Sequence, residues 1–421
     1  MFKSVFGQYM GLRHSIYVLF FGRMVTSMGA LIWPMLTLIL SRKLGYSDSE
    51  VAFILIGIGL VFMPATWIGG RLADRFSRKM LIVILDCISV VFFISCAFVE
   101  PGTTMLVFFV LAGWFAYMEA PVFEALIIDV TKPEEREVAY SLTYLGRNLG
   151  MVVGTALGGM LFNNYLRVAF IIDGVTTFVS TMAIVAFVVI IKSEDLATGK
   201  QNVYEDEIDS DEKTYKVLFD RRSVLLQLLI FFMTGLLYDQ YMFALPLYMN
   251  HLYGASGAVY FGYVASFNAG IAILLTPFIT KLSDRYSELP KIMVGIGLFS
   301  ASYLMIIGNP IYLIFFAFML FFTIGEILNM LGTSPYVSRR VPATHRGRIN
   351  SWVYNAFFLG AMAGKGLVGL MIERYSYEPT FLLLALLGGV TVLMTAYNYK
   401  VDKSRFPKLY NRELEVVEEV E

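Results

Sequence analysis

Charged residues are scarce in this sequence. Asp, Glu, Lys and Arg together make up 16% of the 421 residues, whereas hydrophobic residues make up 57%. Soluble globular domains carry about 25% charged residues, so the composition excludes an ordinary soluble protein and indicates an integral membrane protein. The formal net charge is zero, so the chain has no excess of cations that would attract nucleic acid.

Cysteine and histidine are also rare. Both cysteines, Cys87 and Cys96, fall within one apolar stretch, so we expect no disulfide bond. The three histidines, His14, His251 and His345, lie near the ends of apolar stretches and predict no metal site. The sequence has no zincin histidine pair, glycine-rich phosphate loop or nucleophile elbow. We therefore expect neither a cofactor nor enzyme activity.

Long apolar stretches alternate with short polar segments along the chain. A membrane-spanning helix needs about 20 mostly apolar residues, and twelve stretches meet this requirement. We expect spans at residues 16–40, 50–70, 80–99, 103–129, 139–161, 167–191, 223–250, 259–281, 290–308, 310–339, 348–371 and 378–400. The predicted fold class is an all-α membrane protein with twelve transmembrane helices.

A polar segment recurs in the two halves of the chain. Residues 72–77 (LADRFS) are echoed by residues 282–287 (LSDRYS), 210 positions further on. At the same spacing, Tyr144, Gly150 and Gly154 are matched by Tyr354, Gly360 and Gly364. Such a duplication predicts two pseudo-symmetric six-helix bundles related by an axis along the membrane normal, with a transport pathway between them.

Lysine and arginine are unevenly divided between the two sides of the predicted membrane. One side carries most of the 33 lysine and arginine residues, whereas the other side carries only Arg42, Lys43, Arg167 and Arg374. Because cytoplasmic loops hold the excess of cations, we expect a multi-pass protein of the cell membrane with both termini in the cytoplasm. The predicted domains are an N-terminal bundle (1–192), a cytoplasmic linker (193–222), a C-terminal bundle (223–400) and an acidic cytoplasmic tail (401–421).

Residues 70–79 (GRLADRFSRK) join the second and third predicted spans. They resemble the signature of the major facilitator superfamily, G-x-L-A-D-R-x-G-R-K, with Ser77 in place of the second glycine. Together with the twelve spans and the repeat, this resemblance covers essentially the whole chain and implies the major facilitator fold. It also implies a conformational latch in which Arg78 pairs with Asp129 and Asp74 lies near a helix N-terminus of the other half. The implied latch residues are Gly70, Asp74, Arg75, Arg78 and Asp129.

The fifth predicted span contains Gly150-x-x-x-Gly154-Thr155-x-x-Gly158-Gly159. This segment resembles the antiporter motif of the drug-exporting branches, G-x-x-x-G-P-x-x-G-G, with Thr155 in place of proline. Glycines four residues apart form a smooth helix face on which another helix can pack closely. The motif is therefore compatible with export and equally with helix packing alone.

Several ionisable residues lie near the middle of predicted spans: Arg23, Glu119, Glu124, Arg147, Asp239 and Glu326. Charges at that depth are costly unless they are paired or face water, so these residues are the first functional candidates. The four acids outnumber the two arginines, so at least one or two acids have no fixed cation. Burial favours the protonated form of such an acid. We expect Glu326 to carry the proton, with Asp239, Glu119 and Glu124 as further proton-coupling candidates.

Glu326 also lies in a segment with a family resemblance. Gly325-Glu326-Ile327, followed by Asn350, is similar to a segment of bacterial multidrug/proton antiporters whose span-ten glutamate binds protons and cationic substrate. The run 127–129 (IID) with Asn148 and Gly154 is similar too. Thr143 stands where that branch carries an acid, so its proton stoichiometry does not transfer.

The remaining polar residues within spans have two interpretations each. Arg23 and Arg147 can hold Glu119 or Glu124, or bind an anionic group of a substrate. Lys365, near the outer end of span eleven, is expected to reach the membrane surface with its ammonium group. Asp86 and Asp173 are placed near span ends and are expected to be topological or capping groups.

Aromatic residues and methionine surround Asp239 in the sequence. Tyr238, Tyr241 and Met242 would form an adaptable wall that accepts varied apolar ligands and attracts cations, although such stripes also pack helices. Asn268, Asn329 and Tyr354 would add neutral polar contacts. With Arg23 and Arg147, these are the candidate substrate-binding residues.

The sequence thus predicts a proton-coupled antiporter that exports amphipathic, cationic compounds by alternating access. Its expected partners are a small-molecule substrate, protons and membrane lipids, and we expect a monomer. Within transport, the alternatives are a proton-coupled uptake symporter for a small metabolite and an amphiphile or lipid translocator of the same fold. A transporter-like receptor would be expected to carry long soluble extensions, which the sequence does not indicate.

Overall fold

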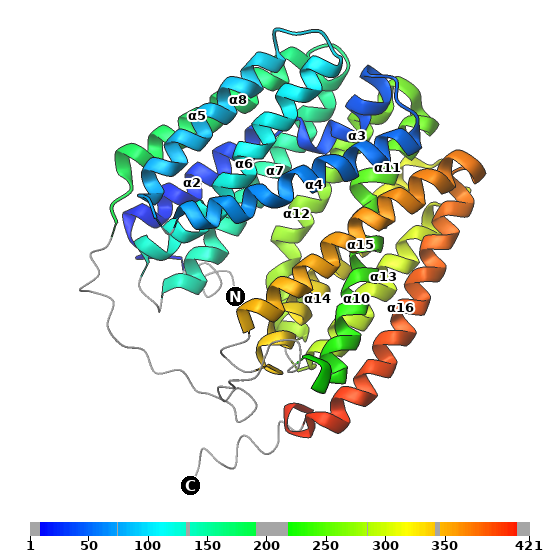
Figure 1. Ribbon diagram of the computed structural model, residues 1–421. Coiled ribbons are helices and arrows are strands. Elements are labelled where there is room, and N and C mark those ends of the chain that lie inside the picture. The colour runs from blue at the N-terminus through cyan, green and yellow to red at the C-terminus, as the bar shows by residue number, and fades with distance from the viewer. Residues whose placement is uncertain are drawn as a thin grey trace. The chain divides into compact units, whose positions relative to one another are not determined.

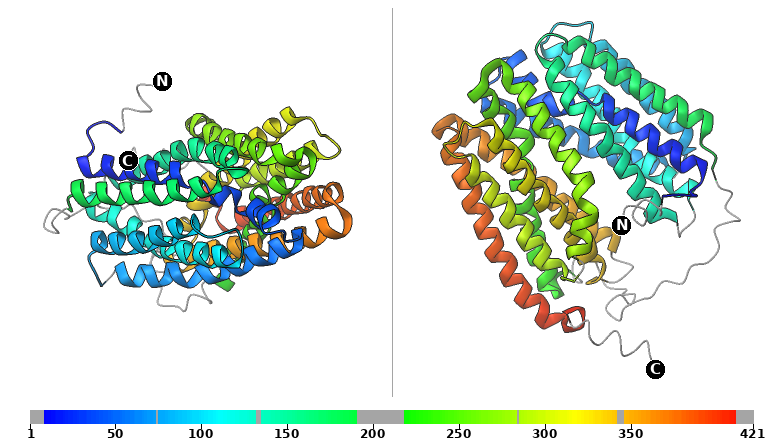
Figure 2. Two further views of the ribbon diagram at one scale, coloured as in Figure 1. Left: turned by 90° about the horizontal axis from the view of Figure 1, so that it is seen from above. Right: turned by 180° about the vertical axis from the view of Figure 1, so that it is seen from behind.

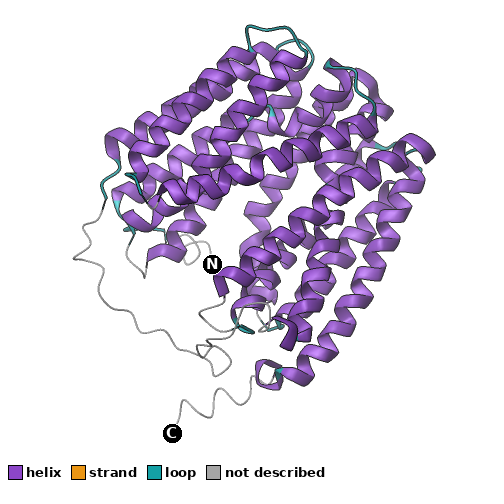
Figure 3. Cartoon of the chain, viewed as in Figure 1, coloured by secondary structure: helices purple, strands orange, loops and turns teal. Residues whose placement is uncertain are grey.

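The computed structural model describes residues 9–73, 75–131, 135–190, 218–283, 285–341 and 346–410. Within these ranges all regular secondary structure is helical (Figure 3). Helices occupy each of the twelve apolar stretches, so the predicted all-α class is confirmed. A bilayer offers backbone groups no hydrogen-bond partners, and a helix satisfies them within its own segment.

The helices of the first half follow one another in chain order (Figure 1). They are α2 (His14–Gly29), η1 (Trp33–Met35), α3 (Leu36–Leu38), η2 (Ile39–Lys43), α4 (Asp48–Ala73), α5 (Arg78–Cys96), α6 (Thr103–Val130), α7 (Arg136–Phe162) and α8 (Leu166–Phe187). The first apolar stretch is broken after Gly29, and the chain resumes at a short turn that contains Pro34. Proline fits the first turn of a helix because the amide it lacks would have no intrahelical partner there.

The helices of the second half repeat this pattern. They are α10 (Arg222–Tyr238), α11 (Gln240–Tyr253), η6 (Gly254–Ser256), α12 (Gly257–Ser283), α13 (Glu288–Ile306), α14 (Tyr312–Ser338), α15 (Arg346–Tyr375), α16 (Tyr377–Arg405) and η8 (Pro407–Tyr410). Ten segments of the described chain are long and apolar enough to cross a membrane. One of them, Arg222–Ser283, is 62 residues long and contains α10, α11 and α12, which is enough for two spans. Helix α7 is not among the ten, and it carries Arg147 and Asn148 at its middle.

The chain forms two compact units. Unit 1 comprises Met1–Lys200 and Leu245–Ile273, and unit 2 comprises Gln201–Ala244 and Leu274–Glu421. The sequence-based domains place residues 245–273 in the C-terminal bundle, whereas their contacts group them with unit 1. A close approach of α7 to α12 contributes to this grouping, because a Cβ atom on Gly159 would lie 2.6 Å from the carbonyl oxygen of Ala258.

Helix packing within each unit follows one scheme (Figures 1 and 2). In unit 1, α2 packs on α7 and α8, while α5 packs on α6 and α8. In unit 2, α10 packs on α15 and α16, while α13 packs on α14 and α16. These neighbours correspond one to one at the offset of 210 residues. The internal repeat of the sequence is therefore also a repeat of helix packing.

Glycines permit the closest of these contacts. A Cβ atom on Gly154 of α7 would lie 2.6 Å from the carbonyl oxygen of Ser27 in α2, and Gly150 faces the same helix. Gly158 faces the backbone of Leu31, just after the end of α2. At the corresponding position in unit 2, a Cβ atom on Gly364 of α15 would lie 2.7 Å from the carbonyl oxygen of Leu236 in α10. The predicted glycine motif thus packs on α2 through Gly150 and Gly154, on the segment after α2 through Gly158, and on α12 through Gly159.

Candidate transport site

Asp239 lies at the junction between α10 and α11, where it caps the end of α10. Its carboxylate forms an ion pair with the ammonium group of Lys365 on α15, and both side chains are about four-fifths buried. The expectation that Lys365 reaches the membrane surface is therefore wrong. A charge in apolar surroundings is stabilised by an opposite charge on a neighbouring helix, and α10 packs on α15 along its length.

Glu326 is linked to this ion pair by Tyr238, the residue that precedes Asp239 in the chain. The Tyr238 hydroxyl donates a hydrogen bond to Oε1 of Glu326 at 2.9 Å. Helix α14 brings Glu326 to this point, and its side chain is half-buried. Tyr238 thus connects two carboxylates: it donates a hydrogen bond to Glu326 of α14, and it is adjacent in the chain to Asp239 at the end of α10.

Aromatic rings surround Tyr238. Its ring centroid lies 5.3 Å from Tyr241, 5.8 Å from Phe322 and 5.7 Å from Phe357. Tyr303, which the sequence did not single out, donates its hydroxyl to the carbonyl oxygen of Leu237 at 2.6 Å. That carbonyl lies in the last turn of α10, where the break between α10 and α11 interrupts the helical ladder. Glu326 and Asp239 therefore lie beside the group of aromatic rings around Tyr238.

The structure brings some of the predicted substrate residues together and separates others. Tyr241 is buried beside Tyr238, and Met242, the next residue of α11, is half-buried. Asn329 lies one turn after Glu326 and donates its side-chain amide to the carbonyl oxygen of Gly325 at 2.9 Å. Asn268 belongs to unit 1, and Tyr354 is 67% exposed.

In unit 1, Arg23 of α2 forms an ion pair with Glu119 of α6 at 3.8 Å. The guanidinium group also lies 3.7 Å above the ring of Phe123, one turn further along α6. Of the two pairings that the sequence left open for Arg23, the structure has the one with Glu119. Glu124 is exposed, and Arg147 is exposed with its guanidinium group 5.3 Å from the ring of Tyr144.

Two buried acids are corrections to the sequence analysis. Asp86 lies in the middle of α5 and accepts a hydrogen bond from Oγ1 of Thr181 on α8 at 2.5 Å. Asp173 is 3% exposed on α8, and its Oδ2 has no hydrogen-bond partner among the described residues. Neither is a capping group, because α5 begins at Arg78 and α8 at Leu166, about two turns earlier. The rule that singled out Glu326, an acid inside an apolar run, would also have selected both.

The latch residues are only partly described. Arg78 at the start of α5 forms an ion pair with Asp129 at the end of α6, and it also donates to the carbonyl oxygen of Ala125 at 3.1 Å. Gly70 lies in the last turns of α4, and Arg75 is exposed in the loop that follows. Asp74 lies outside the described residues.

A buried ionic cluster at the corresponding end of unit 2 was missed in the sequence, where its arginine was counted among loop cations. Arg340 is fully buried and lies 2.7 Å from Asp402 and 3.2 Å from Glu288. Burial alone would lower the pKa of the Arg340 guanidinium, but the hydrogen bonds and charge of Asp402 raise that pKa above its ordinary value. Burial and the charge of Asp402 likewise raise the pKa of Tyr410. The cluster ties α13, α14 and α16 together.

Metal binding has no support in the described ranges, which contain no group of three or more His, Cys, Asp or Glu side chains able to hold a metal ion. The acids near Glu326 are instead surrounded by rings, a hydroxyl group and an ammonium group. Ring faces and carboxylates are groups that attract organic cations.

Comparison with known proteins identifies the family. The profile of the major facilitator superfamily matches residues 16–330 and 274–415. The chain belongs to the major facilitator superfamily. Proteins of this superfamily are transporters that bind small molecules and typically work as monomers. The chain is accordingly a multi-span membrane transporter.

Two relatives within the superfamily align over most of this chain. The Na(+), Li(+), K(+)/H(+) antiporter of Planococcus maritimus is 24% identical over 88% of this chain and 92% of its own. Multidrug resistance protein MdtH of Yersinia pestis (strain Pestoides F) is 27% identical over 74% of this chain and 75% of its own. Among solved structures, a POT peptide transporter in complex with sulfate superposes with a TM-score of 0.73 at 15% identity, covering 95% of this chain and 96% of that chain. This last likeness shows the fold.

Proposed function

We propose that this transporter is a proton-coupled antiporter that exports amphipathic, cationic compounds by alternating access. It would lie in the cell membrane with both termini in the cytoplasm. The observation that carries the proposal is the hydrogen bond from Tyr238 to Glu326, beside the Asp239–Lys365 ion pair and inside a wall of aromatic rings. This arrangement offers a cation two carboxylates and several ring faces within one unit.

Exchange follows from the charge of Glu326. When ionised, its carboxylate attracts a cation and accepts the Tyr238 hydrogen bond. When protonated, it carries no charge, so the attraction for the cation is lost and the substrate leaves. Proton and substrate therefore compete for one group, which is the minimum requirement for antiport. The rings around Tyr238 would bind the apolar part of the substrate and contribute cation–π attraction.

Lys365 adds a second competition. Its ammonium group is paired with the Asp239 carboxylate in the structure, in the position that a cationic substrate would take. Binding of a substrate cation to Asp239 would release Lys365, whereas departure of the substrate would restore the ion pair. Arg23 and Glu119 would hold α2 against α6 in this scheme. Residues 70–79 with Asp129 would latch the cytoplasmic side.

Relatives support the export direction. One is named for multidrug resistance and another for exchange of monovalent cations against protons. Both names imply positively charged or chemically varied cargo, which fits the cluster around Glu326 and Asp239.

A second candidate is proton-coupled uptake of a small zwitterionic metabolite. The observation that favours it is Lys365, because an ammonium group beside a carboxylate can bind both ends of a zwitterion. Uptake and export differ in the direction in which substrate moves relative to the proton. A single transport assay therefore separates them.

The test uses purified protein in liposomes with an imposed pH gradient and tetraphenylphosphonium as substrate. We expect the cation to move against the proton flow, and we expect Glu326→Gln to exchange labelled for unlabelled cation without responding to the gradient. Glu373→Gln, at an exposed acid on the same helix as Lys365, is the control and should behave as wild type. If transport ignores the gradient, or if Glu326→Gln keeps full coupling, the proton assignment is wrong. Movement of a dipeptide with the proton would favour uptake.

A further inference from the structure

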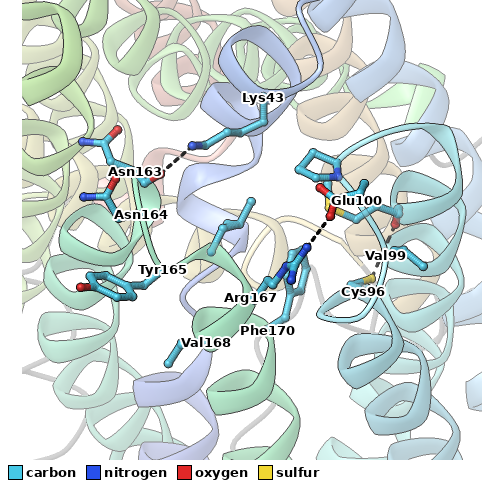
Figure 4. Close-up of a pocket in the computed structure, with 13 residues that line it drawn as sticks. Lys43, Cys96, Val99, Glu100, Asn163, Asn164, Tyr165, Arg167, Val168 and Phe170 are labelled. Carbon is cyan, nitrogen blue, oxygen red and sulfur yellow. Dashed lines mark hydrogen bonds and ion pairs between the residues drawn. The ribbon is translucent and has the colours of Figure 1, made fainter.

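A cavity of about 390 Å³ lies at one end of unit 1, and Figure 4 shows the residues that line it. Its walls come from the end of η2, the loop between α5 and α6, the start of α6, and the turn between α7 and α8. Every lining residue belongs to unit 1. This end is opposite the loop of residues 75–77, so it is the predicted outer end of the unit.

Two cations and one carboxylate line the cavity. Nζ of Lys43 donates to the carbonyl oxygen of Asn163 at 2.8 Å and lies 5.2 Å from the ring of Phe162. Nη2 of Arg167 lies 2.5 Å from Oε1 of Glu100. Figure 4 shows these two contacts on either side of the turn between α7 and α8. An ammonium group has three N–H donors, so Lys43 retains donors for a further acceptor.

The ion pair between Arg167 and Glu100 is weak enough to be exchanged. Their side chains are 63% and 82% exposed, so solvent screens the attraction between the two charges. A phosphate group offers three acceptor oxygens and more charge than a carboxylate. It can therefore compete with Glu100 for Arg167, and Lys43 lines the same cavity.

The position of these cations is itself informative. The sequence places only Arg42, Lys43, Arg167 and Arg374 on the outer side, and Lys43 and Arg167 lie at this one cavity. Cations on the translocated side work against the topology that the other loops set. An anionic occupant gives a physical reason for keeping them there.

Apart from Asn163 and Asn164, the rest of the lining is mainly apolar. Met105 and Phe170 are buried at the cavity, Leu166 is half-buried, and Val168 and Tyr165 are exposed beside them. Tyrosine is enriched where lipid headgroups meet water, because its ring is apolar and its hydroxyl is polar. The occupant that fits this lining is an amphiphile with an anionic head.

We propose that this cavity binds the phosphate headgroup of an anionic phospholipid of the outer membrane surface. Lys43 and Arg167 hold the phosphate, Glu100 is the group that the phosphate displaces, and the acyl chains run past Val168. The site shares no residue with the candidate transport site, and its test does not require transport.

The experiment measures lipid binding to the full chain in detergent by native mass spectrometry. The probes are dioleoyl phosphatidylglycerol, dioleoyl phosphatidylcholine, glycerol 3-phosphate and inorganic phosphate. We expect phosphatidylglycerol to bind best, and we expect Lys43→Gln/Arg167→Gln to weaken its binding by about tenfold, as for the loss of two solvent-exposed ion pairs. Arg374→Gln removes an exposed outer-side cation that does not line the cavity and is the matched control.

Glu100→Gln supplies a result of opposite sign. It keeps both cations and frees Arg167, so phosphatidylglycerol should bind more tightly than to the unaltered protein, even if the double variant does not fold. Equal binding of phosphatidylglycerol by all variants, or weaker binding by Glu100→Gln, would overturn the proposal. Binding of inorganic phosphate as tight as that of phosphatidylglycerol would overturn the lipid as the source of the phosphate.

Discussion

Glu288 and Arg339 form an ion pair at 2.9 Å that repeats the pair of Arg78 and Asp129 with the charges exchanged. Glu288 lies 210 residues after Arg78, and Arg339 lies 210 residues after Asp129. The first pair joins α5 to α6 and the second joins α13 to α14, which are corresponding neighbours in the two units. The position therefore requires opposite charges on two helices, whichever helix carries the cation.

The exchanged charges predict a tolerated swap in unit 1. Arg78→Asp and Asp129→Arg, each alone, place like charges side by side and should each destabilise the protein by about 1–3 kcal/mol. The double variant restores a pair and should recover most of that loss. The measurement is the free energy of unfolding in detergent. A double variant as unstable as the sum of the single variants would show that the orientation matters.

The same swap should fail in unit 2. Glu288 also accepts a hydrogen bond from the buried guanidinium group of Arg340 at 3.2 Å, so Glu288→Arg/Arg339→Glu would put two buried guanidinium groups in contact. In the same unfolding assay, we expect this double variant to be less stable than Arg78→Asp/Asp129→Arg. We also expect it to be less stable than each single variant of the unit 1 pair. Equal stability of the two swapped proteins would contradict this explanation.

Arg340 and Arg339 are neighbours in sequence with very different surroundings. Arg340→Gln leaves Asp402 buried without its cation, and we expect a loss of about 3–5 kcal/mol. Arg339 is 45% exposed, so Arg339→Gln should cost about 1 kcal/mol or less. Arg340→Met/Asp402→Leu removes both charges and should be more stable than Arg340→Gln. Similar losses at positions 339 and 340 would refute the assignment of the buried cluster.

Close packing of α7 on α2 can be tested at Gly154. Gly154→Ala places a Cβ atom 2.6 Å from the carbonyl oxygen of Ser27, so the helices must separate, at a cost of about 1–3 kcal/mol. Gly57→Ala is the matched control, since nothing lies within 4 Å of a Cβ atom there. Alanine favours a helix over glycine, so Gly57→Ala should leave stability unchanged or slightly raised. Thermal unfolding of both variants is the measurement.

The Asp239–Lys365 pair separates stability from transport. Asp239→Asn or Lys365→Met alone leaves one largely buried charge without its partner, and each should destabilise the protein by about 1–3 kcal/mol. The double variant Asp239→Asn/Lys365→Met removes both charges and should recover stability, but it should transport poorly because the second carboxylate is gone. Wild-type transport by the double variant would show that the pair is structural only.

Much of the architecture could be predicted because the bilayer imposes it. Any segment that crosses hydrocarbon must be apolar for about 20 residues and must be helical, so the spans can be located by composition alone. The repeat at 210 residues then related the two halves, and the glycines spaced by four residues indicated a close helix contact before the contacting helix was known. Each of these inferences depends on local sequence.

The candidate site depends on contacts between distant residues, and here the sequence was less informative. Lys365 was expected at the membrane surface and Asp86 at a helix end, yet one holds Asp239 and the other accepts a hydrogen bond from Thr181. Arg340 was counted among loop cations and proved to be buried. Composition gives the number of charges in the spans, but it does not say which helix faces meet.

The sequence by itself determined the class of protein, the number of spans, the duplication and the family resemblance, because hydropathy and motif spacing are properties of single segments. Only the tertiary structure decided that Asp239 pairs with Lys365, that Tyr238 donates to Glu326, and that the second unit carries the latch-like ion pair with its charges exchanged. The physical reason is that a buried charge is stabilised by whichever partner the packing of α10, α14 and α15 brings within a few ångströms. That partner can lie more than a hundred residues away in the chain.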